Sequence, residues 1–320
     1  MSEQDVLGDP YTRETLAMPD DYEGAVVSTL VHRPADRRRS RGAVLHVHGF
    51  CDYFFQTSTA EFFTSLGFDF FALDLRKHGR SLLPHQTPNF CLDLAEYHAD
   101  LDAALSSIRE QTGHQRVVIS AHSTGGLVTP LWVAERASKG DLVADALVLN
   151  SPWLDLQGSF FVRTAGTEAV NRLGLRRPYA TVQRTVSGVY AESLHRDHYG
   201  EWEFDLTWKP LQSLPVKAGW LRAIRAGHRA VHKGVSVPAP VLVLCSHRSM
   251  VPQAYTEQAQ SVDTVLDVRQ IAKWSHQLGD DVTVLRIPGA LHDVFLSRKE
   301  VRKEAFARTA RWLDYALDAE

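Results

Sequence analysis

Short apolar runs recur along most of the chain, and each is followed by turn residues and then by a segment with helical spacing. The strongest runs lie at residues 43–48, 68–73, 116–121, 144–149, 240–245 and 282–287. Runs of about six residues without polar alternation are typical of strands buried on both faces of a sheet. Helical patterns lie between them, at residues 59–66, 92–111, 127–138, 265–278 and 299–317. This rhythm predicts an α/β fold with a mostly parallel central sheet flanked by helices.

The regular alternation breaks between residues 151 and 237, where the pattern is helical and aromatic without a strand-like run in the middle. We therefore expect a core made of residues 1–150 and 238–320, with an inserted helical lid at residues 151–237. An alternating run at residues 24–32 predicts an antiparallel strand ahead of the parallel series. The insertion holds four of the seven tryptophans, Trp153, Trp202, Trp208 and Trp220. They form either a small core of the insertion itself or the wall of a cap over a ligand site.

Charge and cysteine content narrow the class of protein. The 320 residues carry 35 Lys plus Arg against 38 Asp plus Glu, a formal net charge of −3. This balance offers no basic field for a phosphate backbone, so nucleic acid is not an expected partner. Three cysteines without motif spacing indicate reduced thiols in a cytoplasmic protein. The polar start and the lack of a long apolar run predict neither export nor a transmembrane segment, and the oligomeric state stays open.

Residues 120–126, SAHSTGG, follow one predicted strand and precede a predicted helix. A serine in a sharp strand-to-helix turn with small neighbours is typical of a nucleophile elbow, usually written G-x-S-x-G. Here Ala121 stands at the first glycine position, and alanine is the next smallest side chain. Ser123 is the predicted nucleophile, and the N–H of Thr124 at the helix start is a candidate oxyanion donor. A serine that only caps the helix is the alternative.

The pair His48–Gly49 leaves the strand at residues 43–48. A turn there can bring the loop back toward the elbow, so that the N–H of Phe50 becomes the second oxyanion donor. The alternative is an ordinary β-turn. The order of this pair, of the segment DLRKHGRS at residues 74–81 and of the elbow favours the first interpretation.

With these motifs the chain resembles the α/β-hydrolase superfamily, and within it the serine aminopeptidase and monoglyceride-lipase-like group, also called lysophospholipase-like hydrolases. The resemblance covers residues 24–152 and 238 to the C-terminus and rests on HGF, DLRKHGRS, AHSTGG and GALHDVF. Members usually show D-x-R-G-H-G-x-S, and here Lys77 replaces the first glycine. The resemblance implies an α/β-hydrolase fold with an inserted lid and a Ser, Asp/Glu, His triad in that chain order.

His292 follows the last predicted strand, at the sheet edge where Ser123 is expected, and is the predicted base. The family pattern G-x-x-D after the strand at residues 240–245 has Ser249 in place of its acid. Asp263 resembles the family's acid displaced by an insertion at residues 250–262, and we expect it to start the next helix. Asp267, one helical turn on, and Asp155, after the strand at residues 144–149, are the alternatives.

We expect a cofactor-free serine hydrolase of carboxylic esters with small or medium acyl chains, with lysophospholipid or monoacylglycerol as wider options. An aminopeptidase or amidase with the same triad is the first alternative, with Glu201 or Glu203 holding the substrate amine. A fold that has lost its activity and only binds ligands is the second. A metal-dependent hydrolase could be built on His46, His48 and Asp52, but further ligands are missing. No nucleotide-binding glycine motif is present in the sequence.

Overall fold

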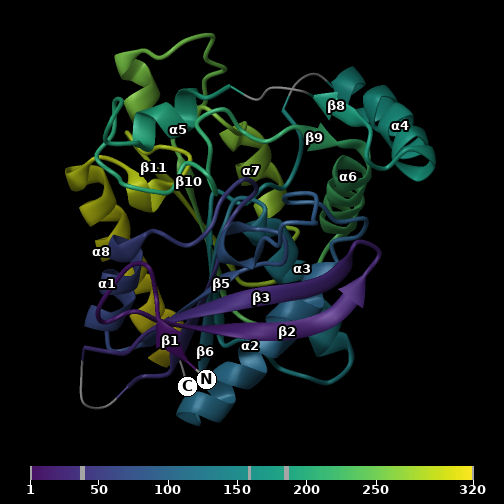
Figure 1. Ribbon diagram of the computed structural model, residues 1–320. Coiled ribbons are helices and arrows are strands. Elements are labelled where there is room, and N and C mark those ends of the chain that lie inside the picture. Colours follow the sequence, from purple (N-terminus) through teal and green to yellow (C-terminus); the bar gives the residue numbers. More distant parts are fainter. Residues whose placement is uncertain (1, 37–39, 158–159, 184–186, 319–320) are drawn as a thin grey trace.

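A nine-stranded sheet forms the centre of the computed structural model, which describes residues 2–36, 40–157, 160–183 and 187–318 (Figure 1). The strand order is β1-β2-β3-β5-β4-β6-β7-β10-β11. The strands from β5 onward run parallel. They are β5 (Asp69–Asp74), β4 (Ala43–Val47), β6 (Val117–His122), β7 (Ala146–Asn150), β10 (Val241–Ser246) and β11 (Val282–Ile287). Each overlaps one of the predicted apolar runs, so the predicted mostly parallel sheet is confirmed.

Antiparallel strands extend one edge of this sheet. They are β1 (Glu3–Gln4), β2 (Thr12–Asp21) and β3 (Gly24–Arg33), and β3 pairs with β5. The alternating run at residues 24–32 predicted β3, whereas no pattern predicted β2. Strand β2 has no fully buried residue, and most of its side chains are polar. Its ten residues are held by the backbone ladder to β3, which a hydrophobic pattern does not reveal.

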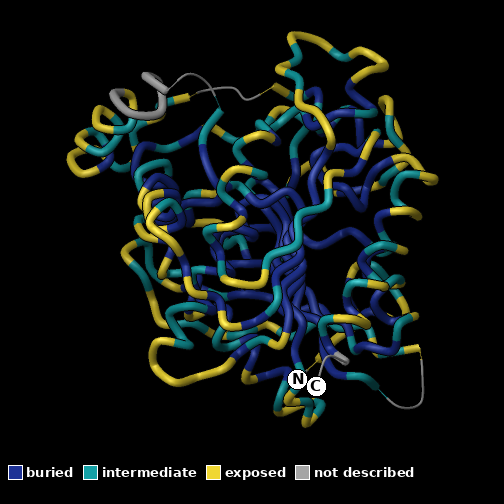
Figure 2. The backbone as a smooth tube through the Cα atoms, turned by 180° about the vertical axis from the view of Figure 1, so that it is seen from behind, coloured by how far each residue is buried: buried dark blue, intermediate teal, exposed yellow. Residues whose placement is uncertain are grey.

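Helices cover both faces of the sheet. One face packs against α2 (Glu96–Thr112), α3 (Gly125–Ser138) and α7 (Val268–Ser275). The other packs against α1 (Thr57–Ser65) and α8 (Lys299–Asp318). Short 3₁₀ turns lie at η1 (Gly79–Ser81), η2 (Glu257–Ser261) and η3 (Val294–Leu296). Figure 2 shows the buried strands running through the centre, with the exposed residues on the surrounding helices and loops.

Residues 151–237 leave the sheet after β7 and return to it at β10. The elements described there are α4 (Phe160–Arg176), β8 (Thr181–Gln183), α5 (Val189–Leu194), β9 (Val216–Lys217) and α6 (Ala218–Lys233). The expectation of a strand-free insertion was wrong, because β8 and β9 pair as a small antiparallel sheet. Helix α6 packs on α3, and its Trp220 and Ile224 belong to the same apolar cluster as the central sheet. This segment therefore shares the main core.

Helix α7 begins later than its periodicity indicated. The Asp263 carboxylate accepts hydrogen bonds from the N–H groups of Val265 and Leu266, at 2.8 Å each, so the chain makes a turn there. The helix starts at Val268, and Asp267 is its N-cap, accepting from the N–H of Arg269. The expectation that Asp263 starts the helix was therefore wrong, because its side chain forms a turn that competes with the helix.

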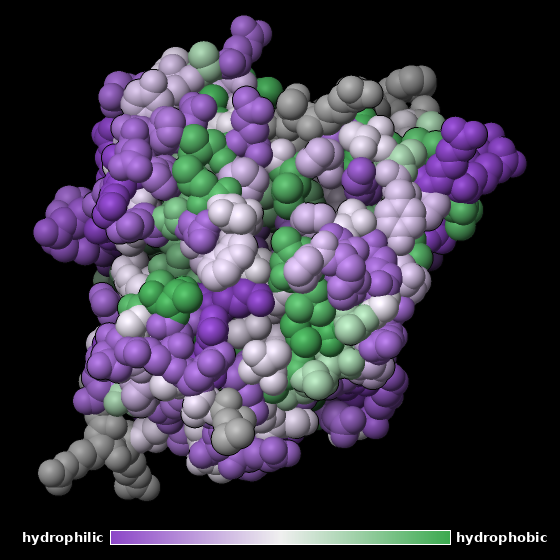
Figure 3. Space-filling model, viewed as in Figure 1, coloured by the Kyte–Doolittle hydropathy of each residue, from purple (hydrophilic) through white to green (hydrophobic). Residues whose placement is uncertain are grey.

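The surface mixes polar and apolar residues. Figure 3 shows apolar residues gathered toward the middle of one face, with strongly polar residues around its rim. Among the described residues, no helix combines the length and the apolar character that a membrane span requires. Cys51, Cys91 and Cys245 are all buried free thiols.

Candidate active site

The Ser123 turn joins β6 to α3 at the carboxyl edge of the parallel strands. Ser123 has a φ of 52°, a left-handed conformation that is rare for residues other than glycine. A side chain at Gly125 would lie 2.5 Å from the carbonyl oxygen of His48, so only glycine fits at that close approach. Ala121 is fully buried within β6 and takes part in its ladder to β7. The turn therefore accommodates alanine in place of the motif's first glycine.

Three residues from distant parts of the chain form one line of hydrogen bonds. His292 Nε2 lies 3.0 Å from Ser123 Oγ, and His292 Nδ1 lies 2.9 Å from Asp263 Oδ2. An ionised carboxylate can only accept, so Nδ1 carries the proton and Nε2 is left to accept from the serine hydroxyl. His292 and Asp263 are both buried, which keeps water from competing for these bonds.

Of the three candidate acids, only Asp263 contacts His292. Asp155 is paired with Arg225 at 2.7 Å, and Asp267 caps α7. Residues 250–262 form a loop closed at its base, because the N–H of Met250 bonds to the carbonyl of Asp263 and the N–H of Asp263 bonds to the carbonyl of Arg248, both at 2.9 Å. Asp263 forms a parallel bridge with Ser249, the residue at the family's acid position. The displaced carboxylate thus lies beside that position in space.

The loop after β4 passes directly beside Ser123. A side chain at Gly49 would lie 2.9 Å from Ser123 Cβ. His48 Nδ1 lies 2.8 Å from the Gly49 carbonyl oxygen, and because the oxygen and the next N–H point in opposite directions, this bond fixes the direction of the Phe50 N–H. Among the described residues, no protein acceptor takes the N–H of Phe50 or Thr124. Both groups are available for an oxyanion.

The H-x-H pair serves the fold. His48 uses both ring nitrogens for backbone groups, because Nε2 also accepts the N–H of Leu75 at 3.1 Å. His46 Nδ1 lies 3.2 Å from Ser120 Oγ, and burial lowers the pKa of His46 to about 3. Within the described part of the chain, no group of three or more His, Cys, Asp or Glu side chains is placed to hold a metal ion. The described residues around His46 and His48 therefore do not supply the ligands that a metal site at this pair would need.

An ion pair that sequence reasoning missed lies close to these hydrogen-bonded residues. Lys209, from the inserted segment, places its Nζ 3.0 Å from Asp52 Oδ1, and both side chains are buried. Burial alone would raise the pKa of Asp52, but the Lys209 ammonium, together with His122 and His48, outweighs burial and holds that pKa well below its usual range. His122 Nδ1 lies 3.5 Å from the same carboxylate. The partners are 157 positions apart, so no local signal could have linked them.

A cavity of about 490 Å³ opens beside Ser123 and His292. Its lining includes apolar side chains, among them Trp153, Trp220, Leu221 and Leu266, and polar side chains, among them Asp52, His122, Tyr190 and Lys209. Of the four tryptophans of the insertion, Trp153 and Trp220 line this cavity, whereas Trp202 and Trp208 pack in or beside the small cluster around Tyr53. Glu201 and Glu203 do not line it, because they pair with Arg302 and Arg196 at the surface.

Comparison with known proteins identifies the family of the chain. The family model for the serine aminopeptidases, S33, matches residues 38–299. Comparison with the curated proteins gave no match.

Solved structures show the same fold. A soluble variant of monoglyceride lipase from Saccharomyces cerevisiae, in complex with a substrate analog, is 17% identical with a TM-score of 0.68, and the alignment covers 95% of each chain. The monoacylglycerol lipase of Paleococcus ferrophilus is 20% identical with a TM-score of 0.65, covering 89% of this chain and 97% of that one. A thermostable carboxyl esterase from Bacillus coagulans, in complex with glycerol, is 16% identical with a TM-score of 0.65, covering 95% and 98%. The predicted α/β-hydrolase fold is confirmed, and the chain belongs to the serine aminopeptidase family S33 of the α/β-hydrolases.

Proposed function

We propose that this protein cleaves carboxylic esters of small or medium acyl chains by two-step acyl transfer through Ser123, His292 and Asp263. The observation that carries the proposal is the continuous line of hydrogen bonds from Asp263 through His292 to Ser123, beside a cavity large enough for an ester. A chain that only binds ligands has no need of this alignment, which favours an active enzyme.

In the first step, Ser123 Oγ attacks the ester carbonyl carbon while His292 Nε2 takes the hydroxyl proton. The carbonyl oxygen becomes an oxyanion, which accepts hydrogen bonds from the N–H groups of Phe50 and Thr124. His292 then gives its proton to the alcohol oxygen as the carbon–oxygen bond breaks. A water molecule repeats the sequence on the acyl-serine, and this second step releases the acid and restores the hydroxyl.

The mixed lining of the cavity favours an ester with an apolar half and a polar half. The neighbouring rings of Trp153 and Trp220 suit an apolar acyl group, and the ion pair of Asp52 and Lys209 suits a polar alcohol. Monoglyceride lipases and a carboxyl esterase are among the similar structures, which agrees with this choice. The amide alternative has less support, because Glu201 and Glu203, its candidate amine ligands, lie outside the cavity. Many of the residues that line the cavity come from the segment 151–237, and we propose that this segment acts as its lid.

The test combines a covalent probe with a substrate panel. Native protein should react with a fluorophosphonate and hydrolyse nitrophenyl esters from acetate to octanoate faster than aminoacyl anilides. Ser123→Ala should lose labelling and at least about a thousandfold in turnover while its circular dichroism spectrum stays native. Full labelling of Ser123→Ala would refute the nucleophile. Faster cleavage of the anilides would refute the preference for esters.

A further inference from the structure

Two residues that line the cavity, Cys51 and Ser123, have left-handed backbone although neither is glycine. In the described part of the chain, left-handed backbone at residues other than glycine occurs at Cys51, Lys77, Asn89, Ser123 and Ser151. Ser123 is the proposed nucleophile, and Ser151 follows the neighbouring strand β7. The remaining three have φ values of 52°, 63° and 56°, in chain order. Such strain persists only where surrounding contacts hold it, and it gathers at functional sites.

These three residues are joined by hydrogen bonds. The N–H of Cys51 donates to Asn89 Oδ1 at 2.7 Å. Asn89 in turn donates to the carbonyl oxygen of Lys77 twice, from its backbone N–H at 2.9 Å and from Nδ2 at 3.1 Å. Asn89 is buried, so no water replaces these bonds. His48 fixes the peptide unit between Gly49 and Phe50. Because Cys51 directly follows Phe50, Asn89 fixes the next peptide unit, between Phe50 and Cys51.

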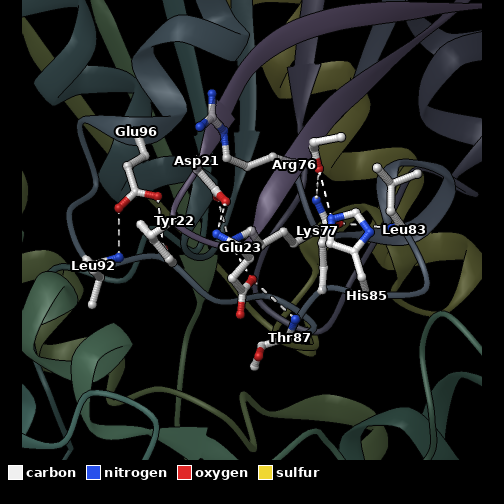
Figure 4. A network of polar contacts seen from close by, with 12 residues as sticks. Asp21, Tyr22, Glu23, Arg76, Lys77, Leu83, His85, Thr87, Leu92 and Glu96 are labelled. Atoms are coloured by element: carbon white, nitrogen blue, oxygen red, sulfur yellow. Dashed lines mark hydrogen bonds and ion pairs between the residues drawn. The ribbon is translucent and has the colours of Figure 1, made fainter.

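Lys77 anchors this chain of contacts to the β2–β3 hairpin. Its Nζ lies 2.7 Å from Asp21 Oδ2 and 2.7 Å from Glu23 Oε2, and its side chain is fully buried. The ammonium also lies 4.5 Å from the ring centre of Tyr22 (Figure 4). Glu23 accepts a further bond from the N–H of Thr87, two residues before Asn89. The hairpin tip, Lys77 and the loop that carries Asn89 are thereby held together.

The choice of lysine at position 77 is informative. The family motif has glycine there, which takes a φ of 63° without strain, whereas lysine is strained and must also bury a charge. The carboxylates of Asp21 and Glu23 compensate for the backbone strain and the buried charge only if the backbone at Lys77 keeps its position. The carbonyl of Lys77 that receives Asn89 is therefore held by the ion pairs as well as by the turn.

We infer that Asn89 and Lys77 are positioning residues for the proposed oxyanion site: they hold the Phe50–Cys51 segment so that the N–H of Phe50 is preset toward the oxyanion. This inference rests on the proposed ester hydrolysis. It predicts a loss confined to transition-state stabilisation, because neither side chain lines the cavity. Binding of the ester in its ground state does not depend on the hydrogen bond between Cys51 and Asn89.

Asn89→Gly tests the first half, because glycine keeps the left-handed backbone and the backbone bond to Lys77 while it removes only the side-chain bridge. We expect kcat for nitrophenyl butyrate to fall about 10- to 100-fold with KM within about twofold. The inhibition constant of a trifluoromethyl ketone, whose adduct with Ser123 carries an oxyanion, should rise by the same factor. A purely structural role would lower the melting temperature of Asn89→Gly and leave kcat and the inhibition constant of the ketone at their native values. Thr309→Ala in α8, which removes another buried hydrogen bond, is the matched control.

The second half is tested by replacing Lys77 together with its partners, since Lys77→Gly alone leaves two buried carboxylates unpaired. The triple variant Lys77→Gly, Asp21→Asn, Glu23→Gln should fold and lose at least about fivefold in kcat, with the same rise in the ketone's inhibition constant. Native kcat in folded Asn89→Gly, or in the folded triple variant, would overturn the corresponding half. A native protein without esterase activity would instead refute the proposed function, and this inference with it.

Discussion

Replacement of Asp263 by asparagine should disable the site through the tautomer of His292. Asp263 Oδ1 accepts the N–H groups of Val265 and Leu266 at 2.8 Å each, whereas Oδ2 faces His292 Nδ1 at 2.9 Å. Asparagine has one acceptor oxygen and one NH₂ group. The two backbone donors require the oxygen, so the NH₂ group must point at His292.

That orientation forces Nδ1 to accept and moves the imidazole proton to Nε2, where it faces the hydroxyl of Ser123. The histidine can then no longer take the serine proton. The same change in a serine protease lowers kcat about 10⁴-fold, equivalent to roughly 5 kcal/mol of activation free energy. Two retained backbone bonds should keep the fold intact, so the melting temperature should change little compared with the loss of rate.

The assay is kcat for nitrophenyl butyrate at neutral pH, beside thermal unfolding and fluorophosphonate labelling. Asp267→Asn is the matched control, because Asp267 caps α7 and makes no contact with His292. It should keep most of the native rate. A folded Asp263→Asn enzyme with more than about a tenth of native kcat would refute the tautomer argument, as would an equal loss in Asp267→Asn.

Replacing the peptide N–H of Thr124 by an ester oxygen, through the α-hydroxy analogue of threonine, should lower kcat about 100-fold or more, since one oxyanion donor contributes roughly 3 kcal/mol. Proline is not a suitable replacement, because it would fit the φ of −61° at Thr124 but disfavours the left-handed backbone of Ser123 before it. Native kcat in the ester variant would exclude the N–H of Thr124 as an oxyanion donor. Burial lowers the pKa values of His46, His78 and His228 to about 3, so on acidification these histidines are protonated in the unfolded chain before they are protonated in the folded protein. The free energy of unfolding should therefore fall as the pH drops below about 6.5. Urea unfolding should show a loss of about 2 kcal/mol per histidine between pH 7 and pH 5, and a flat profile would contradict it.

The sequence predicted those features of the fold and the site that burial and chain order alone determine. Strand β6 is apolar along most of its length because both faces are covered, and Ser123 and His292 each follow a strand whose end lies at one sheet edge. Parallel strands gather their carboxyl ends, so these two residues could be predicted to approach one another. Prediction of Asp263 as the acid required the family pattern in addition, because the loop at residues 250–262 separates Asp263 from strand β10.

Interactions between distant polar residues could not be predicted. Strand β2 is held by pairing with β3, and its polar side chains give no periodic signal. Lys77 and Lys209 look like ordinary surface charges in the sequence, yet both are buried against carboxylates from other parts of the chain. Charge pairing over such separations depends on the folded geometry, and a single sequence carries no record of it.

The loop at residues 250–262 can vary at the cavity mouth independently of the proposed catalytic acid. Its base is clamped by the bonds that hold Asp263, whereas Val251 and Pro252 reach the cavity and Tyr255 stacks on Tyr199 of the inserted segment. Mutations or length changes between these ends reshape the cavity mouth without displacing the carboxylate. If the proposed mechanism holds, changes in this loop alter which substrates enter while the chemical step stays the same.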